Sequence, residues 1–415
     1  MGEPIEFRCV SCGETFAPWT VEYTCPSCGP LKGTLEVLYD YRALGRRLTP
    51  KSFAEVHQHS LWRYEELLPL GREHAVNLRA GGTPLYACRT LAVELGLRGL
   101  WIKDDSLNPT ASCKDRATAV TTAAARKLGR AACSCASTGN AATSLAGFCA
   151  SAGMPCFIFL PESASRPKIA QLQAFGAVVF AIDGTYDQAF DLCAEASTKF
   201  DWFNRSPAVN PMNVEGTKTA ALELWEQLGG ELPEYVIVPV GDGSVISGLC
   251  KAFRELVKVE LAEQVPAVFG VQAEGAPAVA QAFARHVRGD PALPAEAAAQ
   301  TVADSIDVAR PRDVVKAVRY VAETGGGFVT VPDPEILEAG QELARRVGVF
   351  AEPAAAAAYA GLLRLLDAGD VPSQARVAVL ITGSGLKDPE STLRGHPTPT
   401  VISPDLPALE EHLQL

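Results

Sequence analysis

Lys114 is the residue of this chain whose surroundings most clearly suggest chemistry. It lies in the stretch LNPTASCKD, residues 107–115, where a turn marked by Asn108-Pro109 gives way to the helix-prone run DRATAVTTAAARKLG. We therefore expect Lys114 at the start of a helix. Because the partial positive charge of a helix N-terminus disfavours a further cation, an amine there is favoured as a neutral nucleophile, which Schiff-base chemistry requires. An ordinary surface lysine near a helix cap is the alternative interpretation.

The loop Ser137-Thr138-Gly139-Asn140 also carries residues suited to a ligand. It follows the apolar run ACSCA and leads into the helix-prone stretch AATSLAGFCASAG. Its small residues allow backbone amides to approach an anion at a helix start, and the side-chain amide of Asn140 can donate and accept hydrogen bonds. An ordinary strand-to-helix turn explains this loop about as well.

Two later loops are glycine-rich. Gly241-Asp242-Gly243-Ser244 follows the run YVIVPV, and a glycine-rich loop between a strand and a helix can hold a phosphate with its amides. The match to a dinucleotide fingerprint is poor, so a single cofactor phosphate is favoured. Thr382 ends the run VAVLIT, where its hydroxyl can reach a ring nitrogen; a capping threonine before a glycine turn is the alternative.

Four cysteines near the N-terminus have the spacing of metal ligands. They form two CxxC pairs, Cys9 with Cys12 and Cys25 with Cys28, and a glycine directly follows each pair. Four thiolates suit a tetrahedral, closed zinc site, so the spacing predicts a zinc ribbon with a structural metal. The other eight cysteines lie in apolar or alanine-rich segments and are expected to be small buried hydrophobic residues of a reducing cytoplasm.

Short apolar runs must form the elements that position these residues. From Gly81 onward the chain contains the runs LWIKDD, AACSCAS, PCFIFLP, AVVFAID, YVIVPV, AVFGVQA and VAVLIT, most of them separated by a helix-length segment. Unbroken runs of this length are typical of parallel strands buried on both faces. The sequence therefore predicts an α/β fold, with ligands at the carboxyl ends of the strands.

Composition limits the classes of function. The chain has 415 residues, of which 47% are hydrophobic and 20% are charged, as in a globular protein of about two to three domains. Its formal net charge of −11 argues against nucleic acid or an anionic membrane as a partner. We see no secretory signal and no apolar run of about 20 residues, so we expect a cytoplasmic protein.

Taken together, these motifs resemble a known family. The segments GGTPL, LNPTASCKD, STGN, NPMNVEGTKT, PVGDGS, AEPAAAAAYAGL and TGSGLKDP occur in the order found in pyridoxal-phosphate enzymes of the fold type II (tryptophan synthase beta-like) group, specifically the threonine synthase-like family. The resemblance covers residues 81–389. Some members of this family also carry an N-terminal zinc-ribbon-like segment.

The resemblance implies a role for each motif. Lys114 would carry the Schiff base of pyridoxal 5'-phosphate and then act as acid and base. Asn140 would bind the phenolic oxygen of the cofactor, Thr382 its ring nitrogen, and the loop from Gly241 to Ser244 its phosphate. Substrate would contact Ser112 together with the loop Ser137-Thr138-Gly139-Asn140. The implied reaction is conversion of O-phospho-L-homoserine and water into L-threonine and phosphate.

The resemblance also implies a domain organisation. A zinc-ribbon-like segment at residues 1–40 would precede a larger α/β domain of residues 41–109 and 204–400. A smaller α/β domain of residues 110–203 would be inserted in it, and residues 401–415 would form a tail. We expect a homodimer with a small amino-acid substrate.

Departures from the family pattern leave the substrate open. Asn213 stands where we expect a basic residue for the substrate's phosphate, with Arg205, Arg166 and Lys168 as possible replacements. A related β-replacement or elimination enzyme, cysteate synthase-like or serine/threonine dehydratase-like, is therefore an alternative. A non-catalytic binding protein is a more distant one, against which Lys114 and Asn140 argue. The loop Asp304-Ser305-Ile306-Asp307 is expected to face the cleft, with no assigned role.

Overall fold

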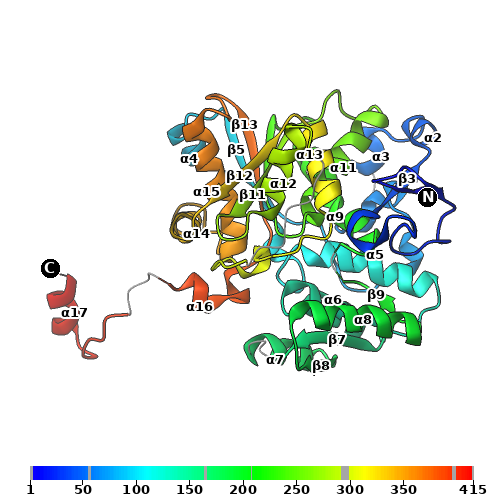
Figure 1. The fold of residues 1–415 in the computed structure, drawn as a ribbon. Helices are drawn as coiled ribbons and strands as arrows, with labels where there is room; N and C mark the ends of the chain where they lie inside the picture. Colours follow the sequence, from blue (N-terminus) through cyan, green and yellow to red (C-terminus); the bar gives the residue numbers. More distant parts are fainter. Residues whose placement is uncertain are drawn as a thin grey trace.

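Three sheets organise this structure, a computed structural model that describes residues 3–54, 58–162, 166–206, 208–290, 299–394 and 399–413 (Figure 1). For residues 54 and 166–168 only the backbone is described. The two larger sheets are parallel except for one edge strand, which confirms the predicted α/β class.

The first sheet is small and antiparallel. Its order is β2-β1-β3, formed by β1 (Pro4–Cys9), β2 (Thr15–Phe16) and β3 (Leu35–Tyr39), and α1 (Gly29–Lys32) follows the second cysteine pair. Phe7 and Val37 face each other across β1 and β3 and are buried. At the end of β3, the Tyr39 hydroxyl donates a hydrogen bond of 2.6 Å to Glu215 Oε2, which joins this sheet to the body.

The six-stranded sheet has the order β12-β11-β10-β13-β5-β4. Its strands are β4 (Leu85–Ala87), β5 (Gly99–Asp104), β10 (Tyr235–Pro239), β11 (Ala267–Ala273), β12 (Gly327–Val331) and β13 (Arg376–Ile381). Successive residues of β10 belong to different cores: Val236 and Val238 to one, Ile237 to the other. This sheet is therefore buried on both faces, as the unbroken apolar runs predicted. The antiparallel edge strand β4 was not predicted.

Helices cover both faces of this sheet. One face carries α4 (Arg89–Glu94), α14 (Asp333–Val347) and α15 (Pro353–Ala368), and the other carries α11 (Ser244–Lys258), α12 (Ala278–Val287) and α13 (Val314–Glu323). The alanine-rich α15 lies close to the strands. A β-carbon on its Gly361 would be 2.3 Å from Val271 Cγ2, so this approach requires glycine.

The four-stranded sheet has the order β8-β7-β6-β9, and all of its pairs are parallel. Its strands are β6 (Cys133–Ala136), β7 (Cys156–Pro161), β8 (Val178–Ile182) and β9 (Phe203–Asn204), and its helices are α5 (Lys114–Lys127), α6 (Asn140–Ala152), α7 (Arg166–Ala174) and α8 (Tyr186–Phe200). Phe190 of α8 packs with Ala136 and Phe159, whereas Leu145 of α6 packs in the large core that includes Cys133. Helices α6 and α8 thus cover opposite faces.

The remaining helices connect these sheets or follow them. They are α2 (Tyr41–Gly45), α3 (Pro50–Ala54), η1 (Leu61–Leu67), η2 (Arg72–His74), η3 (Asp105–Leu107), α9 (Met212–Thr217), α10 (Thr219–Gln227), η4 (Asp304–Ile306), η5 (Gly385–Lys387), α16 (Pro389–Thr392) and α17 (Leu406–Leu413). Helix α17 lies apart from the body in Figure 1. The domain boundaries given above stay a prediction.

The cysteines outside the N-terminal pairs are all free. Seven of the eight are buried, as predicted, and Cys88 is only half-buried.

Candidate active site and metal centre

Lys114 is the first residue of α5, at the position that the sequence predicted. The turn before it is held by Asp115, whose carboxylate accepts hydrogen bonds of 2.6 Å from both the amide and the hydroxyl of Thr110. Ala111 in this turn has a φ of 66°, a left-handed conformation that a β-carbon disfavours. Strained backbone of this kind persists only where surrounding contacts enforce it, and it is frequent at functional sites.

Arg116, which follows Lys114 and Asp115 in the sequence, anchors this turn to the rest of the protein. Its guanidinium is fully buried and donates to Asp105 and Glu223 at 2.7 Å. Glu223 also accepts from Lys103 Nζ and from the amide of Gly82, both at 2.7 Å. Burial opposes ionisation of Glu223, but the two cations hold the pKa of this carboxyl well below its ordinary value. The network therefore fixes the GGTP and KDR motifs against each other.

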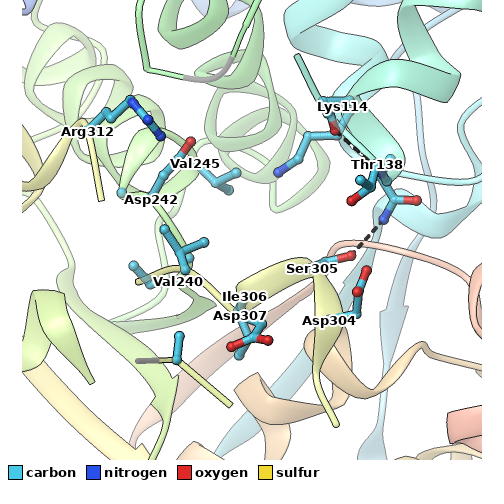
Figure 2. A pocket seen from close by; sticks show the side chains of 18 of the residues that line it. Lys114, Thr138, Val240, Asp242, Val245, Asp304, Ser305, Ile306, Asp307 and Arg312 are labelled. Carbon is cyan, nitrogen blue, oxygen red and sulfur yellow. Dashed lines mark hydrogen bonds between the residues drawn. The ribbon is translucent and has the colours of Figure 1, made fainter. Parts of the chain in front are cut away.

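Lys114 opens into a cavity of about 440 Å³ to which loops of both parallel sheets contribute. Figure 2 shows its side chain reaching into this space, with Asp304, Ser305 and Asp307 on the facing loop. A volume of this size suits a small cofactor. The predicted site residues that line it are Lys114, Ser137, Thr138, Gly139, Asn140, Gly241, Asp242, Gly243 and Thr382. The loop from Asp304 to Asp307, expected to face the cleft, also lines it.

Two predicted site residues, Ser112 and Ser244, are not among the residues that line the cavity. Both side chains are buried, and within the described part of the chain neither hydroxyl has a hydrogen-bond partner. Ser112 pairs with Gly383 in an isolated β-bridge, and the amide of Cys113 donates to Thr382 O at 2.7 Å. These contacts place the lysine turn against the TGSG loop. The predicted ligand contacts of the two serines stay predictions.

Asn140 is held by a glutamate that the sequence did not single out. Its Nδ2 donates to Glu352 Oε1 at 3.0 Å, to Oε2 at 3.1 Å and to Ser305 Oγ at 3.1 Å. Glu352 lines the cavity although its side chain is only 3% exposed, and burial raises the pKa of its carboxyl. The amide of Asn140 is thereby oriented from the side of α15.

The glycine loop before α11 contributes Gly241, Asp242 and Gly243 to the lining of the cavity. Gly243 has a φ of 100°, and a β-carbon on Gly241 would lie 3.2 Å from Ser305 O, so both positions favour glycine. Asp242 Oδ1 accepts a hydrogen bond of 2.9 Å from the Ser244 amide. Together with the unpartnered Ser244 hydroxyl at the start of a helix, this loop fits the phosphate of pyridoxal phosphate, and Lys114 fits its aldehyde.

Two of the residues considered for the substrate's phosphate, Asn213 and Arg205, do not line the cavity. Asn213 is buried in α9, where Nδ2 donates to Ser206 O at 3.1 Å, and it does not line the cavity. Arg205 is 2% exposed and donates from Nε to Thr118 Oγ1 at 3.0 Å, and it does not line the cavity either. The side chains of Arg166 and Lys168 lie outside the described residues.

Sequence reasoning missed a second cluster at the cavity. Arg310 and Arg312 line it from the loop before α13, and Tyr186, Asp187 and Phe190 line it from α8. These contacts join segments more than 100 residues apart, so no local pattern could reveal them. Among the described residues no histidine lines the cavity, in keeping with a site centred on lysine.

The four N-terminal cysteines converge, as their spacing predicted. The Sγ atoms of Cys9, Cys12, Cys25 and Cys28 all lie within 4.8 Å of one another. Cys12 Sγ and Cys25 Sγ are 3.8 Å apart, and roughly 3.8 Å is expected between sulfurs that are each about 2.3 Å from a tetrahedral zinc ion. The four thiols therefore fit a structural zinc ion.

In the described part of the chain, no helix combines the length and the apolar character needed to cross a membrane.

Comparison with known proteins gives consistent matches. The family model "Pyridoxal-phosphate dependent enzyme" matches residues 76–383. The chain is 37% identical over 410 residues to the threonine synthase of Methanocaldococcus jannaschii, covering 98% of this chain and 99% of that protein. It is 36% identical over 354 residues to the threonine synthase of Mycobacterium tuberculosis, covering 85% of this chain and 95% of that protein.

Solved structures with lower identity share the fold. Threonine deaminase isoform 2 from Solanum lycopersicum has a TM-score of 0.63 at 22% identity, covering 73% of this chain and 79% of that one. Maize serine racemase has a TM-score of 0.64 at 19% identity, covering 80% and 92%. At such identities the likeness describes the fold alone.

Proposed function

Because this chain belongs to the pyridoxal-phosphate dependent enzymes, we propose that it is a threonine synthase, which converts O-phospho-L-homoserine and water into L-threonine and phosphate. The observation that carries the proposal is the similarity to threonine synthases along nearly the whole length of both chains. The site supports it, because Lys114, Asn140 and the glycine loop all line one cavity.

We propose the following cofactor contacts. Lys114 Nζ binds the aldehyde carbon of pyridoxal 5'-phosphate, and Asn140 hydrogen-bonds its phenolic oxygen. The loop from Gly241 to Ser244 holds its phosphate, and the Thr382 hydroxyl meets its ring nitrogen. Glu352 accepts hydrogen bonds from Asn140 Nδ2 and so keeps the Asn140 amide turned toward the cavity.

The cofactor, when bound, withdraws electrons from the carbon that bears the amino group and so acidifies its protons. Lys114 is then the group of this chain that moves protons at Cα and Cβ, because it is the amine placed inside the cavity. We infer that the loop Ser137-Thr138-Gly139-Asn140, which lines the cavity, holds the substrate carboxylate. We further propose that closure of the cavity on the substrate excludes bulk water until a water molecule is added at Cβ.

An elimination or β-replacement enzyme is the second candidate. It is favoured by one observation: Asn213, at the position where a basic residue was expected, lies buried in α9 outside the cavity. The two candidates differ in their products.

Product analysis separates them. Purified holoenzyme is incubated in parallel with O-phospho-L-homoserine, O-phospho-L-serine and L-threonine, and threonine, phosphate and ammonia are measured. The proposal predicts equal amounts of threonine and phosphate from the first substrate, and little product from the other two. Ammonia from threonine, or phosphate release from phosphoserine alone, would identify the second candidate instead.

Further properties belong to the same proposal. We propose that Cys9, Cys12, Cys25 and Cys28 hold a structural zinc ion, and that the enzyme is a cytoplasmic homodimer. We also propose that the four-stranded sheet and its helices form the smaller domain, whose movement against the larger one opens and closes the cavity. Light scattering in solution tests the dimer, and metal analysis tests the zinc.

A further inference from the structure

Arg312 is a cation placed at the cavity with no role in the chemistry described so far. Its side chain is 10% exposed, and its guanidinium lies over the ring of Phe190, with Cζ 3.7 Å from the ring centroid. Its Nη2 donates a hydrogen bond of 2.5 Å to Asp187 Oδ1. We propose that Arg312 binds the phosphate group of the substrate, and that Asp187 forms an ion pair with Arg312 when no substrate is present. This inference rests on the proposed function.

The contacts of Arg312 leave room for an anion. A guanidinium has five N–H donors, and among the described residues the structure records one hydrogen bond from this one, to Asp187. The Asp187 side chain is 47% exposed, so it can turn into water at small cost. A phosphate ester carries more negative charge than a carboxylate, and it can accept two parallel hydrogen bonds from the fork where Asp187 accepts one, so it is the stronger partner.

The other cations near the cavity are less suited to this role. Lys114 is assigned to the cofactor and to proton transfer, and Arg205 is buried, does not line the cavity and donates from Nε to Thr118 Oγ1. Arg310 also lines the cavity, but it is Arg312 whose plane is held in place by Phe190 and whose Nη2 donates to Asp187 of the other sheet's helix. Arg310 therefore serves as a matched control.

The position of Arg312 favours the substrate's phosphate over the cofactor's. The next residue, Asp313, donates its amide to Asp242 O at 3.1 Å, so Arg312 sits beside the glycine loop (Figure 2). That loop supplies amides for a permanently bound phosphate. Asp187, by contrast, belongs to α8, which packs on the other sheet, so the pair joins two sides of the cavity. Because Asp187 can be replaced by another anion, Arg312 suits a ligand that enters and leaves in each turnover, as the substrate's phosphate group does.

The test uses holoenzyme with saturating cofactor and isothermal titration with inorganic phosphate. Arg312→Gln is expected to weaken phosphate binding on the order of 10- to 100-fold, the usual effect of losing charge-assisted hydrogen bonds. Asp187→Asn removes the competing anion and is expected to strengthen binding by up to about fivefold, the scale of a part-exposed ion pair. The control Arg310→Gln should change it by less than about threefold.

The decisive result is that Arg312→Gln and Asp187→Asn change the affinity for phosphate in opposite directions. If Arg312 and Asp187 only brace the cavity, both variants should weaken phosphate binding together, and that result would overturn the inference. Equal losses in Arg310→Gln and Arg312→Gln would overturn it as well, as would no measurable binding of phosphate to the wild type. A titration with the cofactor, monitored by absorbance, tests one more outcome. Weaker cofactor binding in Arg312→Gln, with unchanged phosphate affinity, would assign Arg312 to the cofactor instead.

The inference and the proposed function can fail separately. If the wild type does not form threonine from O-phospho-L-homoserine but the two variants shift phosphate affinity in opposite directions, the function is wrong and Arg312 remains a phosphate ligand for another phosphorylated amino acid. If the wild type forms threonine while Arg312→Gln keeps both its phosphate affinity and its KM, the function stands and the role of Arg312 is refuted.

Discussion

Replacing Gly383 by alanine is expected to damage the site by displacing Glu352. A β-carbon at position 383 would lie 2.4 Å from Glu352 Oε1 and 2.6 Å from Glu352 Cδ, closer than real contacts allow. The Glu352 side chain is 3% exposed and packed on all sides, so its carboxylate cannot move without leaving Asn140 Nδ2. The variant should therefore release Asn140 from the orientation in which we propose it binds the cofactor.

The size of the effect follows from the hydrogen bonds that are lost. A hydrogen bond to a charged group contributes about 1.5–3 kcal/mol, and each 1.36 kcal/mol is a factor of about ten in rate. If the orientation of Asn140 matters in the transition state, kcat/KM should fall about 10- to 150-fold in Gly383→Ala, measured by steady-state phosphate release. Glu352→Gln should show a similar loss, because an amide can accept hydrogen bonds at one position only.

A double variant and a control make this prediction refutable. Because both changes act through Asn140, the loss in Gly383→Ala with Glu352→Gln should not exceed the larger single loss. Gly340→Ala lies inside α14, where the added β-carbon would meet only Ala356 Cβ at 3.4 Å, and it should keep wild-type activity. Wild-type kcat/KM in Gly383→Ala, or additive losses in the double variant, would show that Glu352 does not act through Asn140.

Three further predictions concern stability. Glu223→Gln leaves the buried cations Arg116 and Lys103 without a full counter-charge and should lower the free energy of unfolding by about 3–5 kcal/mol in urea titration; a loss below about 1 kcal/mol would contradict the network. Cys25→Ser should abolish bound zinc in metal analysis and lower Tm, whereas Cys250→Ser, at a buried cysteine outside the cluster, should keep the metal; unchanged zinc in Cys25→Ser would refute the site. Burial raises the pKa of Asp313 from its ordinary 3.8 to about 6, so the folded state binds a proton here at a higher pH than the unfolded state does. The free energy of unfolding should therefore rise, by up to about 3 kcal/mol, as pH falls from about 7 to about 4. Asp313→Asn should remove that rise, and an identical pH profile in the variant would rule out Asp313 as its source.

Local patterns were sufficient to predict the parts of the site that are built locally. The turn and helix around Lys114 are set by a short stretch in which Asp115 holds Thr110, so the position of the lysine could be read from the sequence. The CxxC spacing likewise placed four thiols together. The apolar runs predicted the parallel strands, and loops at their carboxyl ends do line one cavity.

Contacts between distant segments could not be predicted in this way. Glu352 reaches Asn140 from 212 positions along the chain, and Arg312 reaches Asp187 from 125 positions. The residues next to each pair in the sequence carry no pattern that predicts these contacts. Position 213 shows the converse: the motif led us to expect a basic phosphate ligand there, but α9 is buried along its whole length and Asn213 lies in the core, which only the packing of the helices decides.

The central claim is that Lys114 carries the cofactor, and one comparison tests it most directly. Wild type and Lys114→Ala, each saturated with pyridoxal phosphate, are reduced with borohydride, digested and examined by peptide mass spectrometry. We expect the cofactor's mass on the peptide that contains Lys114 in the wild type, and neither labelled peptide nor turnover in the variant. Cofactor trapped on another lysine of the wild type, or turnover that persists in Lys114→Ala, would contradict the account.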